Sequence, residues 1–205
     1  MRSVIASNLV SLDGFFAGPK GELDWFVVEE EFSAYVRELL GQVDAILFGR
    51  VTYEMLAGYW PTPASAAEDP IITDAMNKLP KIVFSRTLDR VAWNNSRLAK
   101  EGLAEEISDL KRQPGKDLVL FGSGSIVAAL SQLGLIDEYR IMVNPVVLGS
   151  GTRLFKGMKE RLDLKLVRTK TLASGVVILY YQPMKKQHGH SAQEGPLSGS
   201  TGKPA

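Results

Sequence analysis

Three short stretches of the sequence place glycine, arginine and hydroxyl residues where an apolar run ends. The first holds Gly49, Arg50 and Thr52, the second holds Ser85, Arg86 and Thr87, and the third holds Gly122, Ser123, Gly124 and Ser125. A strand that enters a helix through glycine leaves backbone N–H groups free at the positive end of the helix dipole, which suits an anion. Arginine adds a planar fork of donors, and serine or threonine adds a hydroxyl. Together the three stretches predict a site for a phosphorylated nucleotide.

Each stretch alone has another interpretation. Gly49 and Arg50 could form a tight turn with a surface arginine. In the third stretch, Val127 stands where a dinucleotide fingerprint has its third glycine, and Ser125 lacks the flanking glycines of a hydrolase elbow. A hydrolase that uses Ser123 or Ser125 would also need a base, and both histidines lie near the C-terminus.

The composition of the 205 residues excludes several other classes of site. Lys+Arg number 24 and Asp+Glu number 23, so the net charge of +1 favours neither nucleic acid nor an anionic membrane. The absence of cysteine removes disulfides, thiolate catalysis and cysteine-bound metals. The first residues form neither a signal-peptide core nor a membrane span. We expect a soluble, cytoplasmic protein without a metal.

The last residues differ in composition from the rest of the chain. Residues 184–205 are rich in glycine, serine, proline and lysine and contain few apolar side chains, which predicts a disordered tail after one domain of residues 1–183. A metal site formed by His188 and His190 is the alternative interpretation of this segment.

Alternating strands and helices are expected to position the three stretches. Apolar, β-branched runs predict strands at 2–9, 45–48, 81–85 and 117–121, and helical spacing predicts helices at 29–43, 51–60, 71–80, within 97–115 and before Gly134. Loops are expected at 11–26 and 61–70. A further strand and a glycine-rich loop follow in 136–155, and 162–172 with 175–183 predict an antiparallel pair. The pattern indicates a mixed sheet with helices on its faces.

Five stretches spread over most of the chain carry a resemblance to a known family. They are "ASNLVSLDGFFAG", "DAILFGRVTYEML", "KIVFSRTL", the block 121–155 and "LASGVVILYYQP". The sequence resembles the dihydrofolate reductase-like superfamily, most closely the reductase domain of bacterial riboflavin biosynthesis and its stand-alone relatives. The resemblance implies a three-layer α/β/α fold, with a mixed, mostly parallel sheet of about eight strands and a C-terminal antiparallel hairpin. It also implies an NADPH-dependent reductase and a homodimer.

The resemblance assigns cofactor roles to the three stretches. Gly49, Arg50 and Thr52 match the motif that contacts the cofactor phosphates. Residues 85–87 match the segment that holds the adenosine 2′-phosphate, which favours NADPH over NADH. Residues 122–125 match the turn across the pyrophosphate and the nicotinamide side, although Ser123 replaces the second glycine of classical dihydrofolate reductases.

Further residues are expected around the nicotinamide and the substrate. The resemblance places Ala6 and the loop from Asp13 to Phe16 beside the nicotinamide. Asp13 and Glu31 are the expected catalytic carboxylates, although Glu31 could simply stabilise the first turn of its own helix. The expected substrate contacts are Phe16, Asp24, Trp25 and Arg153, with plain packing as the alternative for Trp25 and a surface arginine as the alternative for Arg153.

The resulting hypothesis is an NADPH-dependent reductase of a pyrimidine-ribosyl phosphate, of the 5-amino-6-(5-phosphoribosylamino)uracil type, or of a related heterocycle. The chain lacks the His-x-Glu and Cys-x-x-Cys signature of the zinc deaminase that accompanies this reductase in bifunctional relatives. The alternatives are dihydrofolate reductase activity and an NADPH-binding module without turnover. A side chain that blocks C4 of the nicotinamide would favour binding alone.

Overall fold

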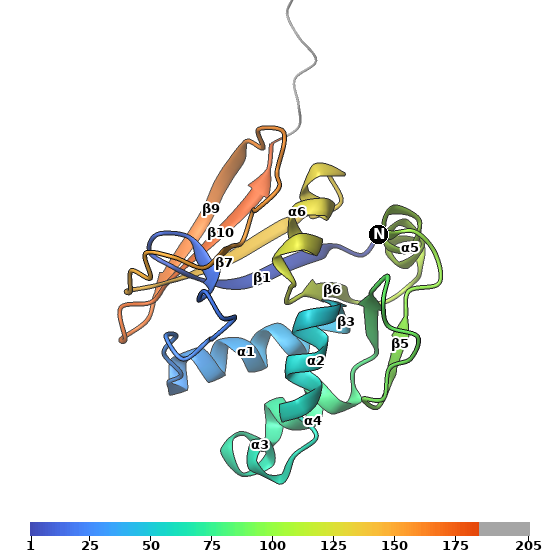
Figure 1. The fold of residues 1–205 in the computed structure, drawn as a ribbon, viewed down its shortest axis with the longest axis horizontal. Coiled ribbons are helices and arrows are strands. Elements are labelled where there is room, and N and C mark those ends of the chain that lie inside the picture. Colours follow the sequence, from blue (N-terminus) through green and yellow to red (C-terminus); the bar gives the residue numbers. More distant parts are fainter. Residues whose placement is uncertain (185–205) are drawn as a thin grey trace, which may run out of the picture.

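An eight-stranded sheet organises the computed structural model, which describes residues 1–184 (Figure 1). The strand order is β5-β4-β3-β6-β1-β7-β10-β9, and a separate pair joins β2 and β8. The strands are β1 (Val4–Ser11), β2 (Phe15–Ala17), β3 (Val43–Gly49), β4 (Lys81–Phe84), β5 (Ser96–Leu98), β6 (Asp117–Leu120), β7 (Glu138–Asn144), β8 (Thr152–Arg153), β9 (Leu164–Thr171) and β10 (Val177–Pro183).

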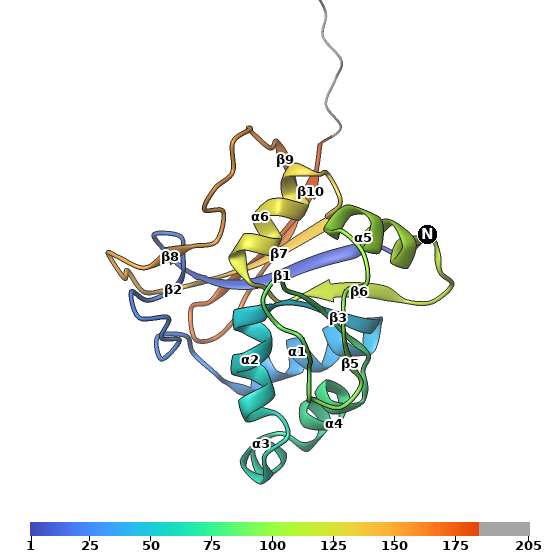
Figure 2. The same ribbon diagram turned by 45° about the vertical axis from the view of Figure 1, so that its right-hand side comes forward.

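Helices cover both faces of the sheet. They are α1 (Glu30–Gln42), α2 (Arg50–Tyr59), α3 (Pro63–Glu68), α4 (Pro70–Lys78), α5 (Leu103–Arg112) and α6 (Gly124–Gln132). Helices α1 to α4 lie on one side of the sheet, and α5 and α6 lie on the other (Figures 1 and 2). Among residues 1–184, none of the helices combines the length and the apolar character needed to span a membrane.

Strand direction confirms the expected mixed sheet. Strands β5, β4, β3, β6, β1 and β7 run parallel to their neighbours, and β10 pairs antiparallel with both β7 and β9. The carboxyl ends of the parallel strands therefore meet at one edge of the sheet, where loops and helix N-termini gather. The antiparallel pair β9–β10 confirms the predicted C-terminal hairpin.

Two apolar clusters, one on each face, hold the layers together. In β1, Ile5 belongs to the cluster that includes Tyr35 and Leu39 of α1, whereas Val4 and Ala6 belong to the cluster beneath α5 and α6. Alternate side chains of a strand point to opposite faces, so a strand that is covered on both sides is apolar throughout. This explains the apolar runs at residues 45–48, 82–84 and 118–120 of β3, β4 and β6.

The structure corrects three sequence expectations. Residues 61–70 contain α3, which begins at Pro63, and the predicted loop 11–26 contains β2, which pairs with the distant β8. The segment 97–115 is helical only from Leu103, because Ser96–Leu98 forms a strand beside β4. Local periodicity could not reveal β2 or β5, since each is three residues long and is defined by a distant partner. The predicted tail lies outside the described residues from 185 onward, as do His188 and His190.

Candidate functional site

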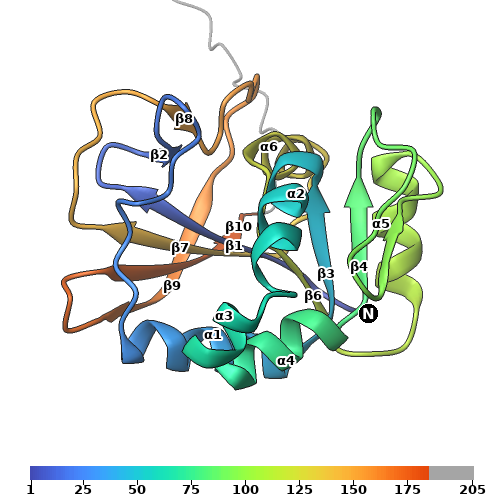
Figure 3. The ribbon, with the colours of Figure 1, turned by 60° about the horizontal axis from the view of Figure 1, so that its bottom comes forward.

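The three predicted stretches meet at the carboxyl edge of the sheet, because their strands are neighbours (Figure 3). Gly49 at the end of β3 pairs with Phe84 at the end of β4, which places Ser85 beside Arg50. On the other side of β3, Leu47 pairs with Leu120 of β6, two residues before Gly122. Adjacent strands lie about 5 Å apart. The stretches, far apart in the sequence, thus form one continuous border.

Two helices begin at the centre of this border. Helix α2 starts after Gly49 and α6 starts after Ser123, and neither helix has a side-chain cap at its first turn. The Gly49 N–H donates to the Gly122 carbonyl oxygen at 2.8 Å, which joins the two turns. The Gly122–Ser123 peptide bond is cis. Two positive helix ends with free N–H groups therefore converge at one place, an arrangement suited to a pyrophosphate.

The glycines of these turns serve close packing between the turns as well as access to the backbone. A Cβ on Gly49 would overlap Ser123 Oγ, and a Cβ on Gly122 would lie 2.9 Å from both Phe16 Cζ and Thr52 Oγ1. Gly122 also has a φ of +127°, which L side chains rarely adopt. Thr52 is buried in this packing. Glycine at these positions is therefore required by the protein itself, which the sequence interpretation did not foresee.

The arginines of the border differ in their availability. Arg50 Nη1 lies 2.9 Å from Glu54 Oε2 one turn along α2. In the neighbouring turn, Ser85 Oγ accepts hydrogen bonds from the N–H groups of Thr87 and Leu88, at 3.1 and 2.9 Å. Arg86 is exposed and has no hydrogen-bond or ion-pair partner within residues 1–184. The hydrogen-bonded turn therefore presents an uncompensated guanidinium.

Strand β1 borders the site on its other side. Ala6 pairs with Leu120 and is completely buried on the face covered by α5 and α6, so only its backbone could border a ligand. Two residues further, Asn8 is buried and neither polar atom of its amide has a hydrogen-bond partner among the described residues. Both amide atoms are covered by protein, so Asn8 belongs to the core and is not a contact for a ligand.

Asp13 binds the loops together. Its carboxylate accepts a hydrogen bond from the Ser11 hydroxyl at 2.7 Å and from the N–H groups of Leu148 and Gly149 at 3.1 and 2.8 Å. These bonds, that of Ser11 above all, lower the pKa of Asp13 to about 2. A carboxylate held in its ionised form suits the joining of two loops and opposes proton donation near neutral pH. The low pKa of Asp13 therefore argues against its expected catalytic role.

Glu31 lies at the first turn of α1, near the hairpin turn between β9 and β10. Its Oε2 accepts the N–H of Ala173 at 2.6 Å, and the neighbouring Glu29 accepts the hydroxyl of Ser174. One oxygen of Glu31, Oε1, has no hydrogen-bond partner within residues 1–184. Glu31 therefore anchors α1 to the hairpin and keeps one oxygen free, and its catalytic role remains a prediction.

Of the four expected substrate residues, Phe16 and Arg153 lie on the paired strands β2 and β8, whereas Asp24 and Trp25 lie on a separate loop. Phe16 packs beside Gly122 and so belongs with the cofactor turn. The guanidinium of Arg153 lies 4.6 Å from the ring centroid of Phe15, at the same end of the sheet. Trp25 donates to the carbonyl oxygen of Glu22 within its own loop at 3.2 Å, and Asp24 is exposed on that loop.

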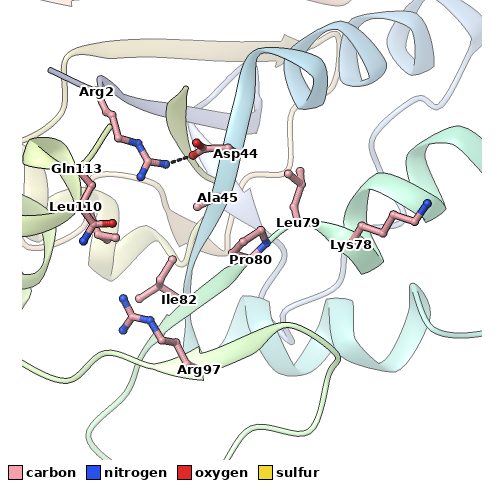
Figure 4. Close-up of a pocket in the computed structure, with 10 residues that line it drawn as sticks. All are labelled: Arg2, Asp44, Ala45, Lys78, Leu79, Pro80, Ile82, Arg97, Leu110 and Gln113. Carbon is pink, nitrogen blue, oxygen red and sulfur yellow. Dashed lines mark hydrogen bonds and ion pairs between the residues drawn. The ribbon is translucent and has the colours of Figure 1, made fainter. Parts of the chain in front are cut away.

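A separate hollow of about 570 Å³ lies at the opposite, amino edge of the sheet (Figure 4). Arg2 and Asp44 point toward one another across it and form an ion pair, whereas Lys78 points away (Figure 4). Arg97, also in its lining, forms an ion pair with Glu106. The hollow contains none of the predicted site residues.

The chain is similar to one protein family and to individual proteins within it. The family model described as the RibD C-terminal domain matches residues 2–178. The uncharacterized protein YyaP of Bacillus subtilis is 36% identical over 180 residues, which cover 88% of this chain and 94% of YyaP. The 2,5-diamino-6-ribosylamino-4(3H)-pyrimidinone 5′-phosphate reductase of Aquifex aeolicus is 25% identical, and the match covers 80% of this chain and 88% of that protein.

Solved structures share the fold. A crystal structure of a protein from Shewanella sp. PV-4 superposes with a TM-score of 0.70 and 24% identity, covering 89% of this chain and 99% of that chain. A dihydrofolate reductase from Enterococcus faecalis, solved with NADP(H), gives a TM-score of 0.60 and 14% identity, covering 89% and 97%. The fold is therefore dihydrofolate reductase-like.

Proposed function

Because the chain belongs to the RibD C-terminal domain family, we propose that it is an NADPH-dependent reductase of a pyrimidine-ribosyl phosphate or a related heterocycle. The observation that carries the proposal is the convergence of the α2 and α6 N-termini beside the turn that presents Arg86. The family and the name of the Aquifex relative support the substrate class. When bound, NADPH would supply a hydride from C4 of its nicotinamide.

The proposed cofactor contacts follow the border of the site. The free N–H groups after Gly49 and Ser123 bind the pyrophosphate, and Arg50 adds charge. Ser85, Arg86 and Thr87 bind the 2′-phosphate. A phosphate monoester carries more negative charge than a ribose hydroxyl, so an uncompensated arginine at this position favours NADPH over NADH.

The proposed substrate side lies near the loops that carry β2 and β8. Arg153 offers a cation to the substrate phosphate, and Phe16 offers an aromatic edge next to the cofactor turn. Reduction of a C=N or C=O group consumes a hydride and a proton. We assign Asp13 to positioning of the loops, and we retain Glu31, with its free oxygen, as the candidate proton donor.

The proposal is tested by titrating the full chain with NADPH and NADH while following tryptophan fluorescence. Wild-type protein should bind NADPH more tightly, and Arg86→Ala should weaken NADPH binding about tenfold or more, toward the NADH level. Arg90→Ala, an exposed arginine of the same loop, is the matched control and should change neither affinity. If the wild-type protein binds neither NADPH nor NADH, the proposal is refuted.

Turnover is tested separately with two substrates. NADPH oxidation should require the aminopyrimidine ribosyl phosphate, and activity with dihydrofolate instead would select the alternative reductase. An NADPH-binding module without turnover is the second candidate, favoured by the engagement of both Asp13 and Glu31 with backbone N–H groups. NADPH binding with no oxidation in the presence of either substrate would support that candidate.

We also propose a homodimer. Strand β9 is an exposed edge of the sheet, and Leu166 and Val167 on it are both exposed. Such an edge is commonly covered in assembled proteins. Light scattering at micromolar protein should give the mass of two chains, and the mass of one chain would contradict the proposal.

A further inference from the structure

The buried hydroxyl of Tyr53 carries an inference that rests on the proposed function. Tyr53 lies on α2, one turn after Arg50, and is 5% exposed. Its Oη accepts the N–H groups of Ala92 and Trp93, each at 3.0 Å. These two residues belong to the loop between β4 and β5, which also presents Arg86. One side chain of α2 therefore binds the loop that carries the uncompensated guanidinium.

The loop between β4 and β5 is attached to the protein at few points. At its start, Ser85 Oγ accepts two backbone N–H groups of its own turn. Residues 89–91 then form no hydrogen bond within residues 1–184, although Val91 packs against the apolar cluster that contains Tyr53. After the Ser85 turn, the Tyr53 hydroxyl is therefore the next hydrogen-bonded anchor of the loop.

The ring of Tyr53 packs among other buried aromatic rings, which holds its hydroxyl in place. Its centroid lies 6.4 Å from that of Phe48 on β3 and 6.2 Å from that of Trp93 in the loop. A buried N–H that loses its acceptor costs free energy, so the two bonds to Oη are favoured over an open loop. Packing and hydrogen bonding together hold α2 and the loop at one separation.

We propose that Tyr53 is a positioning residue that supports the preference for NADPH over NADH by holding the Arg86 loop at a defined distance from α2. In the proposed site, the N-terminus of α2 binds the pyrophosphate and the Arg86 turn binds the 2′-phosphate of the same molecule. Two groups that bind one molecule do so best when their separation is set before binding, because no ordering cost is then deducted. Tyr53 is buried and acts through Arg86, not by contact with the cofactor.

The test compares NADPH with NADH, which differ only in the 2′-phosphate. Tyr53→Phe keeps the ring and removes the acceptor, so both N–H groups lose their partner. The affinity for NADPH should fall about threefold to tenfold, the cost of ordering one loosened side chain on binding. The affinity for NADH should stay at the wild-type value. An unchanged ratio of the two affinities, or an equal loss for both nucleotides, would overturn the role of Tyr53.

A double-mutant cycle shows whether Tyr53 acts through Arg86. In the Arg86→Ala background, Tyr53→Phe should leave the NADPH-to-NADH ratio at the value that Arg86→Ala alone gives, because no guanidinium remains to be positioned. A further fall by the same factor as in the wild-type background would show that the two residues act independently and would overturn the proposed route.

Tyr35→Phe provides a matched control. Tyr35 belongs to the same apolar cluster and is 2% exposed, but it lies on α1, and its hydroxyl is 3.1 Å from Ser7 Oγ. Both substitutions remove one buried hydroxyl, and only Tyr53→Phe should change the NADPH-to-NADH ratio. An equal change in the Tyr35 variant would show a general effect of lost stability and would overturn the role of Tyr53.

Hydrogen exchange in the wild-type protein tests the same role if Tyr53→Phe does not fold. Coupling between two sites is reciprocal, so a ligand that engages Arg86 must also stabilise the bonds that hold its loop. NADPH should therefore slow exchange of the Ala92 and Trp93 amides more than NADH does at equal occupancy. Equal protection by both nucleotides would overturn the role of Tyr53 and leave the cofactor site intact. Absence of any nucleotide binding would refute the proposed function, and this inference with it.

Discussion

The two edges of the sheet use charged and polar groups in opposite ways. At the amino edge, three cations have carboxylate partners: Arg2 pairs with Asp44, Lys111 with Asp137, and Arg97 with Glu106. At the carboxyl edge, two helix N-termini and the Arg86 guanidinium have no partner within residues 1–184. Paired groups stabilise the fold, whereas preorganised unpaired groups can bind a ligand.

The volume of a cavity does not by itself show which edge of the sheet binds a ligand. The amino edge has the hollow of about 570 Å³, yet the charges of Arg2 and Arg97 in its lining are compensated (Figure 4). Lys81, fully buried at the start of β4, donates to the carbonyl oxygens of Asn77 and Leu79 at the end of α4. The proposed site is therefore placed at the edge with unmet hydrogen-bonding capacity, and the hollow at the other edge is a feature of the fold.

The largest effect is expected from Gly122→Ala at the carboxyl edge. The new Cβ would meet Phe16 and Thr52 at 2.9 Å, at a φ of +127°. We expect a loss of about 2–3 kcal/mol in the free energy of unfolding and loss of NADPH binding, measured by denaturant titration and fluorescence. Gly41→Ala in α1, where a Cβ would meet no atom within 4 Å, should keep or slightly raise stability. Equal behaviour of the two variants would show that the turn is not tightly packed.

A pH-dependent effect is expected at the amino edge from Lys81→Met. Burial lowers the pKa of Lys81 to about 8, below the value of about 10.4 in an unfolded chain. Between these values the unfolded state binds more protons, so the free energy of unfolding of the wild type should rise by about 2 kcal/mol from pH 8 to pH 10 relative to the variant. Chemical denaturation at several pH values measures the difference. Parallel pH curves for the two proteins would contradict the lowered pKa.

A smaller effect is expected from Asp13→Asn. The amide keeps the shape of the side chain but cannot accept the same strong bonds from Ser11 and Gly149, so we expect KM for the substrate to rise a few-fold with kcat nearly unchanged. The pKa of about 2 means that this carboxylate stabilises the wild type above about pH 4 and that the contribution is lost as the pH falls toward 2. A large fall in kcat with an altered pH profile would restore Asp13 as a catalytic acid.

The smallest change in stability is expected from Glu31→Gln. The amide oxygen can still accept the Ala173 N–H, so the free energy of unfolding should change by less than about 0.5 kcal/mol. If Glu31 donates the proton, kcat falls and the basic limb of its pH profile disappears. An unchanged kcat would assign Glu31 to the anchoring of the hairpin alone.

Much of the fold could be predicted from the sequence, because the central strands are apolar on both faces and the helices follow them in regular alternation. The glycine turns at Gly49 and Gly122 also follow from local pattern, since a strand that turns into a helix needs little long-range information. Strands β2 and β5 could not be predicted, because residues distant in the sequence define them.

The details of the site depended on contacts that no local pattern encodes. The sequence suggested that Asp13 could be catalytic, but its role in joining two loops depends on Leu148 and Gly149, more than 130 residues away. Likewise the bonds of Tyr53 to the Arg86 loop could be recognised only once Ala92 and Trp93, 39 and 40 residues further along the chain, were placed.

The position of β6 in the sheet has a consequence for how the protein is made. Strand β6 (Asp117–Leu120) lies between β3 and β1, although both of those strands emerge from the ribosome long before it. Until β6 inserts, β1 and β3 have no common neighbour and the α2 and α6 turns cannot meet. Contacts between segments this distant in the sequence form slowly, because the intervening chain must first be ordered. A nascent chain shorter than about 130 residues should therefore be unable to retain the proposed nucleotide, because the insertion of β6 must come before the border of the site can form.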